Sequence, residues 1–339
     1  MRVVYSFVAN FGADGQRARA AERDGHDAVY VSETANDPFL DALVAAQSTE
    51  HVEVGTSIVV AFARTPMVTA YSANQLQAAS GGRFVLGLGS QIQPHIERRF
   101  GMPWSRPAAR MRDYIAALRE IWTCWQDGTR LDFRGEFYQH TLMPPFFSPG
   151  PNPHRPPPIL LAAVGRRMTR VAAETADGII CHAFTTERYL REVTAPAIDA
   201  ARPGGRGDFR VQLPTFVVSA PTEETMADAV LATRRQLAFY ASTPAYLPVL
   251  TLHGWGELHT ELNRLSKAGR WDEMGELFTD ELLHAFAVVG EPDTVAREIE
   301  RRFGGIVTDI GLYAPYAMDP HVARRIVSDL TADRPATAQ

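Results

Sequence analysis

The chain alternates apolar, often β-branched runs with helical segments along nearly its whole length. Eight of these runs indicate buried parallel strands, because such strands are covered on both faces. They are expected at Arg2–Phe7, Asp27–Val31, Val54–Val60, Arg83–Gly89, Ile159–Ala163, Gly178–Cys181, Phe209–Ser219 and Val307–Tyr313. Strands that alternate with helices predict a parallel sheet, and eight is the number that closes a (β/α)8 TIM barrel. The alternative, an open doubly wound sheet, favours a GxGxxG fingerprint after the first strand, and residues 7–12 lack one.

The 339 residues suit a single α/β domain with insertions, which we expect to span residues 1–331. The alternation is interrupted near 90–105, 128–157 and 236–285, so insertions are predicted there. The second holds a hairpin around Gly135 and a proline-rich connection. The third contains Tyr240, Tyr246, His253 and Trp255 and is expected to form much of the substrate lid and pocket. Residues 332–339 are expected to form a disordered tail.

Composition excludes several classes of protein. The net charge of −5 carries no long single-sign run, which argues against nucleic-acid or membrane-surface partners. No apolar run is long enough to span a bilayer, and the N-terminus leads directly into a strand without signal-peptide features. The two cysteines, Cys124 and Cys181, form neither a CxxC pair nor a disulfide framework. A cytoplasmic protein is therefore expected.

Metal and hydrolase motifs are missing from the sequence. The ten histidines are scattered, with no HxH after the first strand and no HExxH, so no metal site is expected. The carboxyl ends of the expected strands, where a barrel keeps its site, are rich in glycine, small and apolar residues. They contain Phe7, Asn10, Glu33, Thr34, Ser57–Val60, Gly89, Ser90, Gln91, Val164–Arg167 and His182. One carboxylate and one histidine are few for acid–base chemistry, so the pattern favours a cofactor that brings its own reactivity.

Three of these features carry specific hypotheses. The turn Gly165–Met168 joins a strand to a helix, where free N–H groups and the arginines Arg166 and Arg167 favour a phosphate. The alternative is two solvated arginines on a first helical turn. Glu33 and His182 are the candidate catalytic groups; the alternatives are a loop carboxylate that caps backbone and a satisfied structural histidine.

Several motifs, taken in order, resemble the luciferase-like monooxygenase superfamily and its coenzyme F420-dependent oxidoreductase branch. The matching segments cover nearly the whole chain and are Gly55–Pro66, Leu76–Ser90, Ile96–Gly101, Phe133–Tyr138, Pro158–Ala163, Ala176–Ile180 and Val289–Pro292. The resemblance implies a bacterial luciferase-like barrel that binds F420, or alternatively FMN, at the strand carboxyl ends. It also implies a non-proline cis peptide, at Ser57–Ile58 by position, against the central ring of the cofactor.

The resemblance also assigns cofactor contacts. Ser90 and Gln91, after Gly89, would lie near the ring or the ribityl chain, and Glu33 and Thr34 match a strand-two position that faces the ring. By resemblance, phosphate contacts fall on Val164, Gly165, Arg167 and Met168. Arg166 and Phe7 join the expected cofactor contacts through their positions at strand carboxyl ends. The family's sugar-phosphate dehydrogenases have a glutamate and a histidine where this chain has Ile92 and Thr34, which argues against sugar-phosphate oxidation.

The resulting hypothesis is an F420-dependent oxidoreductase that exchanges a hydride between the deazaflavin C5 and a small organic substrate. An FMN-dependent luciferase-like monooxygenase is the alternative on the same fold. A non-catalytic flavin- or deazaflavin-binding protein is the alternative of another class. By resemblance, a homodimer or higher homo-oligomer is expected.

Overall fold

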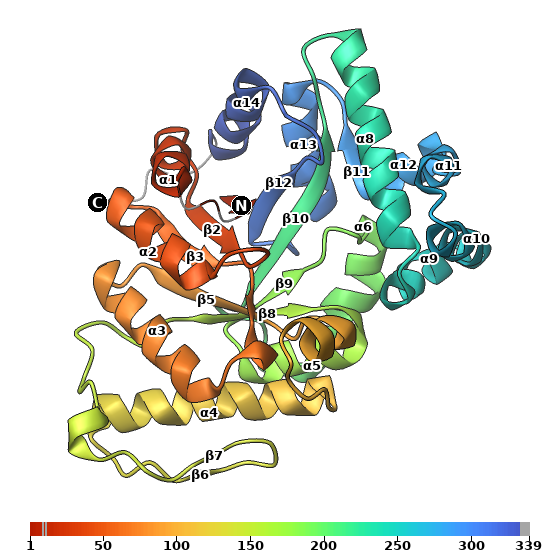
Figure 1. The fold of residues 1–339 in the computed structure, drawn as a ribbon. Helices are drawn as coiled ribbons and strands as arrows, with labels where there is room; N and C mark the ends of the chain where they lie inside the picture. The colour runs from red at the N-terminus through yellow and green to blue at the C-terminus, as the bar shows by residue number, and fades with distance from the viewer. Residues whose placement is uncertain (9, 11, 333–339) are drawn as a thin grey trace.

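The computed structural model describes residues 1–8, 10 and 12–332. Its centre is a ring of parallel strands in which each strand pairs with the next along the chain (Figure 1). Pairing of the last strand with the first closes the ring and confirms the (β/α)8 barrel. The ring consists of β1 (Arg2–Val8), β2 (Ala28–Ser32), β3 (Glu53–Thr56), β5 (Phe84–Gly89), β8 (Ile159–Ala163), β9 (Gly178–Cys181), β10 (Arg210–Val218) and β12 (Asp309–Tyr313).

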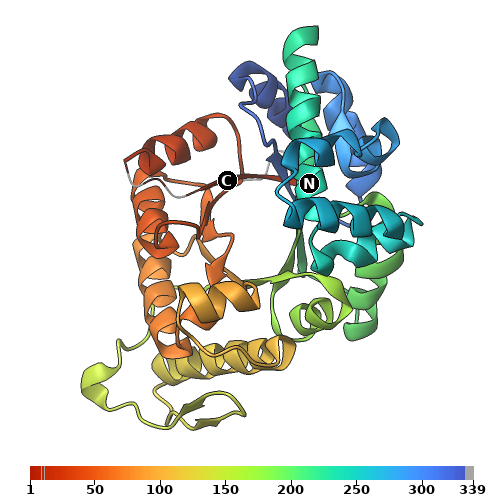
Figure 2. The same cartoon turned by 45° about the vertical axis from the view of Figure 1, so that its right-hand side comes forward.

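Helices form an outer layer around the ring, as Figure 2 shows from a second direction. They are α1 (Asp14–Arg23), α2 (Pro38–Ser48), α3 (Pro66–Ala79), α4 (Pro107–Asp127), α5 (Gly165–Thr175), α6 (Glu187–Tyr189), α7 (Ala195–Ala201), α8 (Glu223–Ala241), α9 (Leu247–Leu252), α10 (Gly256–Lys267), α11 (Trp271–Glu276), α12 (Asp280–Phe286), α13 (Pro292–Phe303) and α14 (Pro320–Thr331). The side chains of Asp37 and Thr65 cap α2 and α3, and in each case a proline follows at the first helical position. No helix in the described ranges is long and apolar enough to cross a membrane.

The strand expected at Val54–Val60 is broken in two, and this is the main correction to the predicted elements. β3 ends at Thr56 and β4 (Val59–Val60) resumes after the peptide bond between Ser57 and Ile58. Val59 lies five positions after Val54, whereas their partners Phe84 and Leu88 on β5 are four positions apart. The segment therefore carries one extra residue, which makes it a bulge. The Thr56 hydroxyl bridges the gap, since it bonds both the N–H and the carbonyl of Gly87, at 3.0 and 2.9 Å.

The barrel interior and the layer between barrel and helices are separate apolar cores. The interior core lies inside the ring and is made of Val4, Ala28, Tyr30, Val85, Leu160 and Ile180. Successive residues of a strand point to opposite faces, so these positions define which residues of each strand point inward. Toward the strand carboxyl ends, the same alternation directs further residues into the barrel, among them Ser6, Ser32, Gly87, Gly89, Ala162, His182 and Gly311.

Charged groups fill the opposite end of the barrel. The Arg210 guanidinium donates to Asp309 at 2.6 Å, to Glu53 at 2.9 Å and to the Tyr30 hydroxyl at 2.9 Å. Burial together with the nearby carboxylate of Glu53 raises the pKa of Tyr30. Buried charges are tolerated when they are paired and hydrogen-bonded, as these are. This cluster occupies the amino-terminal end of the barrel, so a ligand site inside the ring is restricted to the other end.

The segments near 90–105, 128–157 and 236–285 carry elements beyond the regular strand–helix alternation. The first holds a π-helical turn (His95–Arg99), and the second holds the predicted hairpin, with strands β6 (Phe133–Arg134) and β7 (Gln139–His140). The boundary expected near residue 236 falls inside α8, and the helical segment continues to α12. A short strand that we did not predict, β11 (Ala287–Val289), pairs with the last three residues of β10. From residue 333, the expected tail lies outside the described residues.

Candidate functional site

Small side chains line the carboxyl-terminal mouth of the barrel. Most of its inward positions are serines, glycines and an alanine, and the larger inward side chains there are Val8, His182, Phe216 and Tyr313. Two of the glycines are required by close contacts, because a Cβ at Gly87 would lie 1.8 Å from the Thr56 carbonyl and one at Gly89 would lie 2.7 Å from Ile58. Glycine in a strand interior often marks such a close approach. The bulge at Ser57–Ile58 therefore packs directly against β5 at the mouth.

Apolar side chains at the mouth are exposed, although the same residue types are buried elsewhere in the barrel. Val8 ends β1, and Ile92 and Val164 follow β5 and β8; their side chains are 54%, 50% and 42% exposed. Single exposed apolar residues are ordinary, but three at the ends of barrel strands indicate a surface that an apolar ligand can cover. A flat ring system is a ligand of this kind.

The peptide bond between Ser57 and Ile58 is cis, as the resemblance implied. Glu33 holds the segment that contains it. The Glu33 carboxylate accepts the backbone N–H of Val60 at 2.7 Å and the Arg64 guanidinium at 2.8 Å, and the Glu33 N–H donates to the Ile58 carbonyl at 3.3 Å. The side chain of Glu33 is only 4% exposed. Its carboxylate is therefore engaged in shaping the bulge.

The residues after β5 adopt an uncommon backbone conformation. Gln91 has a φ of 58°, which side chains other than glycine, asparagine and aspartate seldom adopt. Its side-chain oxygen accepts the N–H of Ile92 at 3.0 Å, and the Ser90 hydroxyl donates to the Gln91 carbonyl at 3.1 Å. Left-handed non-glycine residues concentrate at functional sites, which supports the predicted position of Ser90 and Gln91 at a ligand.

The turn from β8 into α5 presents free donors and positive charge. Among the described residues no side chain caps α5, which begins at Gly165 with a φ of 75°. Arg166 and Arg167 are exposed, and neither forms an ion pair with a described residue. The Met168 side chain packs into the outer core, so this residue offers only its backbone. An uncapped helix terminus with two unpaired arginines is a geometry that favours an anion.

The two ring nitrogens of His182 have different partners. Nδ1 accepts the Phe184 backbone N–H at 3.0 Å, so the neutral ring carries its proton on Nε2, which faces the Tyr246 hydroxyl at 3.0 Å. Burial lowers the pKa of His182 to about 4. The ring is therefore neutral at physiological pH. The neutral ring can donate a hydrogen bond to a neighbouring group through its Nε2–H. It is not an imidazolium at that pH and so has no second proton to transfer.

One predicted contact, Phe7, lies elsewhere than expected. Phe7 packs in the outer core, because side chains alternate along β1 and the side chain of Phe7 points toward the helices. The Arg17 guanidinium lies 5.9 Å from its ring centroid. Ser6 and Val8 are the β1 residues with inward parity, and the alternation around the inner-core Val4 could have identified them. Thr34 is exposed at the mouth, where its carbonyl accepts the Arg99 guanidinium.

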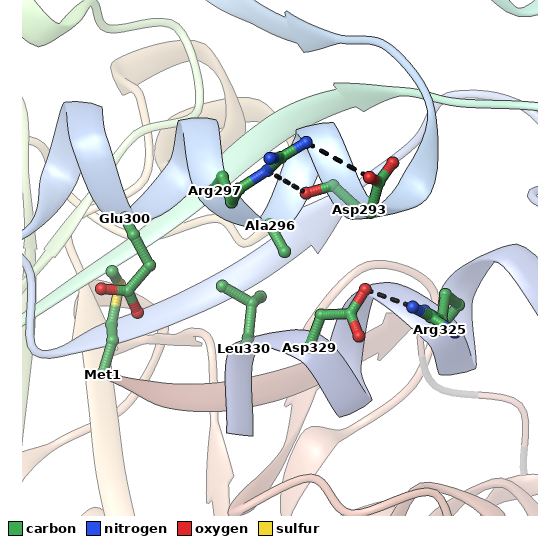
Figure 3. Close-up of a pocket in the computed structure, with 8 residues that line it drawn as sticks. All are labelled: Met1, Asp293, Ala296, Arg297, Glu300, Arg325, Asp329 and Leu330. Carbon is green, nitrogen blue, oxygen red and sulfur yellow. Dashed lines mark hydrogen bonds and ion pairs between the residues drawn. The ribbon is translucent and has the colours of Figure 1, made fainter. Parts of the chain in front are cut away.

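A recess in the surface lies away from this mouth (Figure 3). It has a volume of about 650 Å³ and lies between α13 and α14 beside Met1. Its charged walls are largely neutralised, because Arg297 pairs with Asp293 and Arg325 pairs with Asp329 within their own helices. In the described part of the chain no three histidine, cysteine or acidic side chains gather in a way that could hold a metal ion.

A family model for luciferase-like monooxygenases matches residues 8–309 of the chain. The chain belongs to this family. Within it, an uncharacterised protein of Mycobacterium tuberculosis is 51% identical over 293 residues, which cover 86% of each chain. A provisionally named coenzyme F420-dependent oxidoreductase of the same organism is 30% identical over 298 residues, which cover 83% of this chain and 84% of the relative.

Solved structures agree on the luciferase-like fold. The coenzyme F420-dependent tetrahydromethanopterin reductase of Methanopyrus kandleri superposes with a TM-score of 0.77 at 18% identity, over 97% of each chain. The oxygenating constituent of 3,6-diketocamphane monooxygenase of Pseudomonas putida, in complex with FMN, superposes with a TM-score of 0.68 at 19% identity. The latter match covers 98% of this chain and 97% of that one. At these identities the matches show the fold alone.

Proposed function

We propose that this protein is an F420-dependent oxidoreductase that exchanges a hydride with a small organic substrate. The observation that carries the proposal is the pairing of a small, apolar barrel mouth with an uncapped helix terminus and two unpaired arginines. A phosphorylated, flat cofactor needs these two features together. A relative at 30% identity is provisionally named a coenzyme F420-dependent oxidoreductase, which favours the deazaflavin. Another, at 25% identity, is named a 5,10-methylenetetrahydromethanopterin reductase.

The residues at the mouth divide into three proposed roles. Ser57 and Ile58 back the ring, with Gly89, Ser90, Gln91 and Thr34 around it, and Val164 to Met168 receive the phosphate through backbone N–H groups and the two arginines. Glu33 acts as a positioning residue, because its carboxylate is buried against Val60 and Arg64. The bound cofactor supplies the hydride chemistry at its C5, and the protein supplies orientation and exclusion of water.

An FMN-dependent monooxygenase remains the second candidate, since a structure with the same fold holds FMN. The third is a protein that holds a flavin or deazaflavin without turnover.

We also propose a homodimer, and its contact surface would include the exposed Leu40 and Val68 at the starts of α2 and α3. Large apolar side chains exposed on neighbouring helices are suited to such an interface.

The test is equilibrium binding of F420 and FMN to the purified protein, followed by turnover with a panel of ketones, enones and alcohols. Tight F420 binding with turnover is expected. Replacing Arg166 and Arg167 together by alanine should weaken F420 binding at least about tenfold, because two charge-assisted contacts are lost. The matched control is Arg170→Ala, one turn further along α5, where the arginine is already paired with Glu174. Tight FMN binding without F420 binding would support the monooxygenase, and binding without turnover would support the holder.

A further inference from the structure

Aromatic side chains from separate elements gather on one side of the barrel mouth. His182, after β9, stacks on Tyr246 with ring centroids 4.4 Å apart and meets the edge of Tyr240 on α8 at 4.8 Å. Phe216 on β10 lies 4.7 Å from Tyr313 at the end of β12. We name these five residues the aromatic wall. His182 has inward parity on its strand, so the wall borders the same mouth as the proposed cofactor site.

The hydrogen bonds of the wall leave one phenol proton in a defined position. Because His182 Nδ1 is occupied by the Phe184 N–H, its Nε2–H donates to the Tyr246 oxygen at 3.0 Å. That oxygen is therefore an acceptor, and its own proton has no acceptor among the described residues. Tyr240 and Tyr313 instead bond to each other at 3.2 Å.

No charged side chain forms part of the wall. The contacts of the His182 ring among the described residues are with the Phe184 N–H, Tyr246 and Tyr240, none of which is ionised, and burial lowers its pKa. The pKa of Tyr246 is raised by burial, with the neighbouring Tyr240 as the second cause. A substrate carboxylate or phosphate placed here would lose its hydration without gaining a cation. An uncharged, carbon-rich substrate with an oxygen acceptor suits the wall.

We propose that Tyr246 is the proton donor to an uncharged aromatic or alicyclic ketone and that His182 is its positioning residue. The proposal rests on the proposed function, which supplies the hydride. The substrate carbonyl carbon gains that hydride with its two electrons, and the carbonyl oxygen takes the proton as the Tyr246 O–H bond breaks. The product is a secondary alcohol, the cofactor is oxidised by two electrons, and solvent returns the proton to the tyrosinate. The Nε2–H of His182 stabilises that tyrosinate by hydrogen bonding.

The test is carbon-13 NMR of acetophenone labelled at its carbonyl, bound to the protein with and without oxidised F420. Oxidised F420 has no hydride to give, so the ketone persists. Hydrogen bonding by Tyr246 should move the carbonyl resonance downfield, and Tyr246→Phe should abolish the displacement and weaken binding about fivefold. Tyr71→Phe is the matched control, because its hydroxyl donates to the Phe147 carbonyl outside the barrel.

Two further measurements separate the roles and the substrate class. His182→Phe keeps a stacking ring but removes the Nε2–H, so it should raise the pKa of Tyr246. This pKa is measured by a pH titration of the Tyr246 resonance in protein labelled at tyrosine Cζ. 4-Carboxyacetophenone should bind at least tenfold more weakly than acetophenone. Equal binding of the two ketones, or a displacement lost in Tyr313→Phe but kept in Tyr246→Phe, overturns the proposal. A displaced ketone resonance in a protein that binds no F420 would instead contradict the proposed cofactor and leave the donor role of Tyr246 in place.

Discussion

Replacing Glu33 by alanine tests whether this carboxylate holds the bulge at the barrel mouth. The change removes the acceptor of the Val60 N–H and the close ion-pair partner of Arg64. Both side chains are mostly buried, with 4% of Glu33 and 15% of Arg64 exposed. Removing one partner of a buried ion pair costs about 3–5 kcal/mol. Arg64 keeps Asp37 at 3.0 Å, which reduces the loss. We therefore expect the free energy of unfolding to fall by about 3 kcal/mol.

The assay is urea unfolding followed by tryptophan fluorescence, with Asp37→Asn as the matched control. Asp37 binds the same arginine but its side chain is 45% exposed, and asparagine preserves its capping of α2. The control should lose less than about 1 kcal/mol, as is usual for exposed ion pairs. If the two variants lose the same stability, or if Glu33→Ala loses none, Glu33 does not hold the bulge. A shifted pH profile of turnover in a fully stable Glu33→Gln variant would instead assign it proton transfer.

Three further predictions concern the cofactor turn and two buried titratable groups. Gly165→Asp should weaken F420 binding at least about tenfold, because it places a carboxylate at the anion site. Gly150→Asp, at another open position with positive φ, should leave F420 binding unchanged. Isothermal titration calorimetry compares the two affinities. Burial and the neighbouring Asp14 raise the pKa of Asp41 to about 6, so stability is lost as pH rises from about 4 to 6. Asp41→Asn should therefore stabilise the protein by about 2 kcal/mol at pH 8 and by little at pH 4, as measured by urea unfolding. His182, with its pKa lowered to about 4, should cost up to about 3 kcal/mol of stability as pH falls from 6.5 to 4, and His182→Gln should remove that part of the pH dependence.

The sequence predicts the barrel well where local pattern decides the structure. β8 and β9 have the predicted bounds, because each is a short apolar run between turn residues. The caps at Asp37 and Thr65 follow from a polar side chain placed before a proline. These features depend on residues within a few positions of one another.

The remaining features depend on residues that are distant in the sequence. Val54–Val60 is one largely β-branched run that predicts a single strand, and it is split by contacts with Glu33 and Gly87, which no local pattern contains. β11 has only three residues and exists because it pairs with the end of β10. The sequence indicates Tyr246 only as one of four residues expected near the substrate pocket, and its pairing with His182 arises from a segment 64 residues further along the chain. Such contacts require the tertiary structure.

The central claim is that the strand carboxyl ends form the cofactor site. The most direct measurement is a crystal structure of the protein soaked or co-crystallised with F420. We predict density for the deazaflavin ring against Ser57–Ile58 and for its phosphate at the start of α5, within hydrogen-bond distance of the backbone at Gly165–Met168. Density for F420 only in the recess between α13 and α14, with the barrel mouth empty at saturating ligand, would contradict the account.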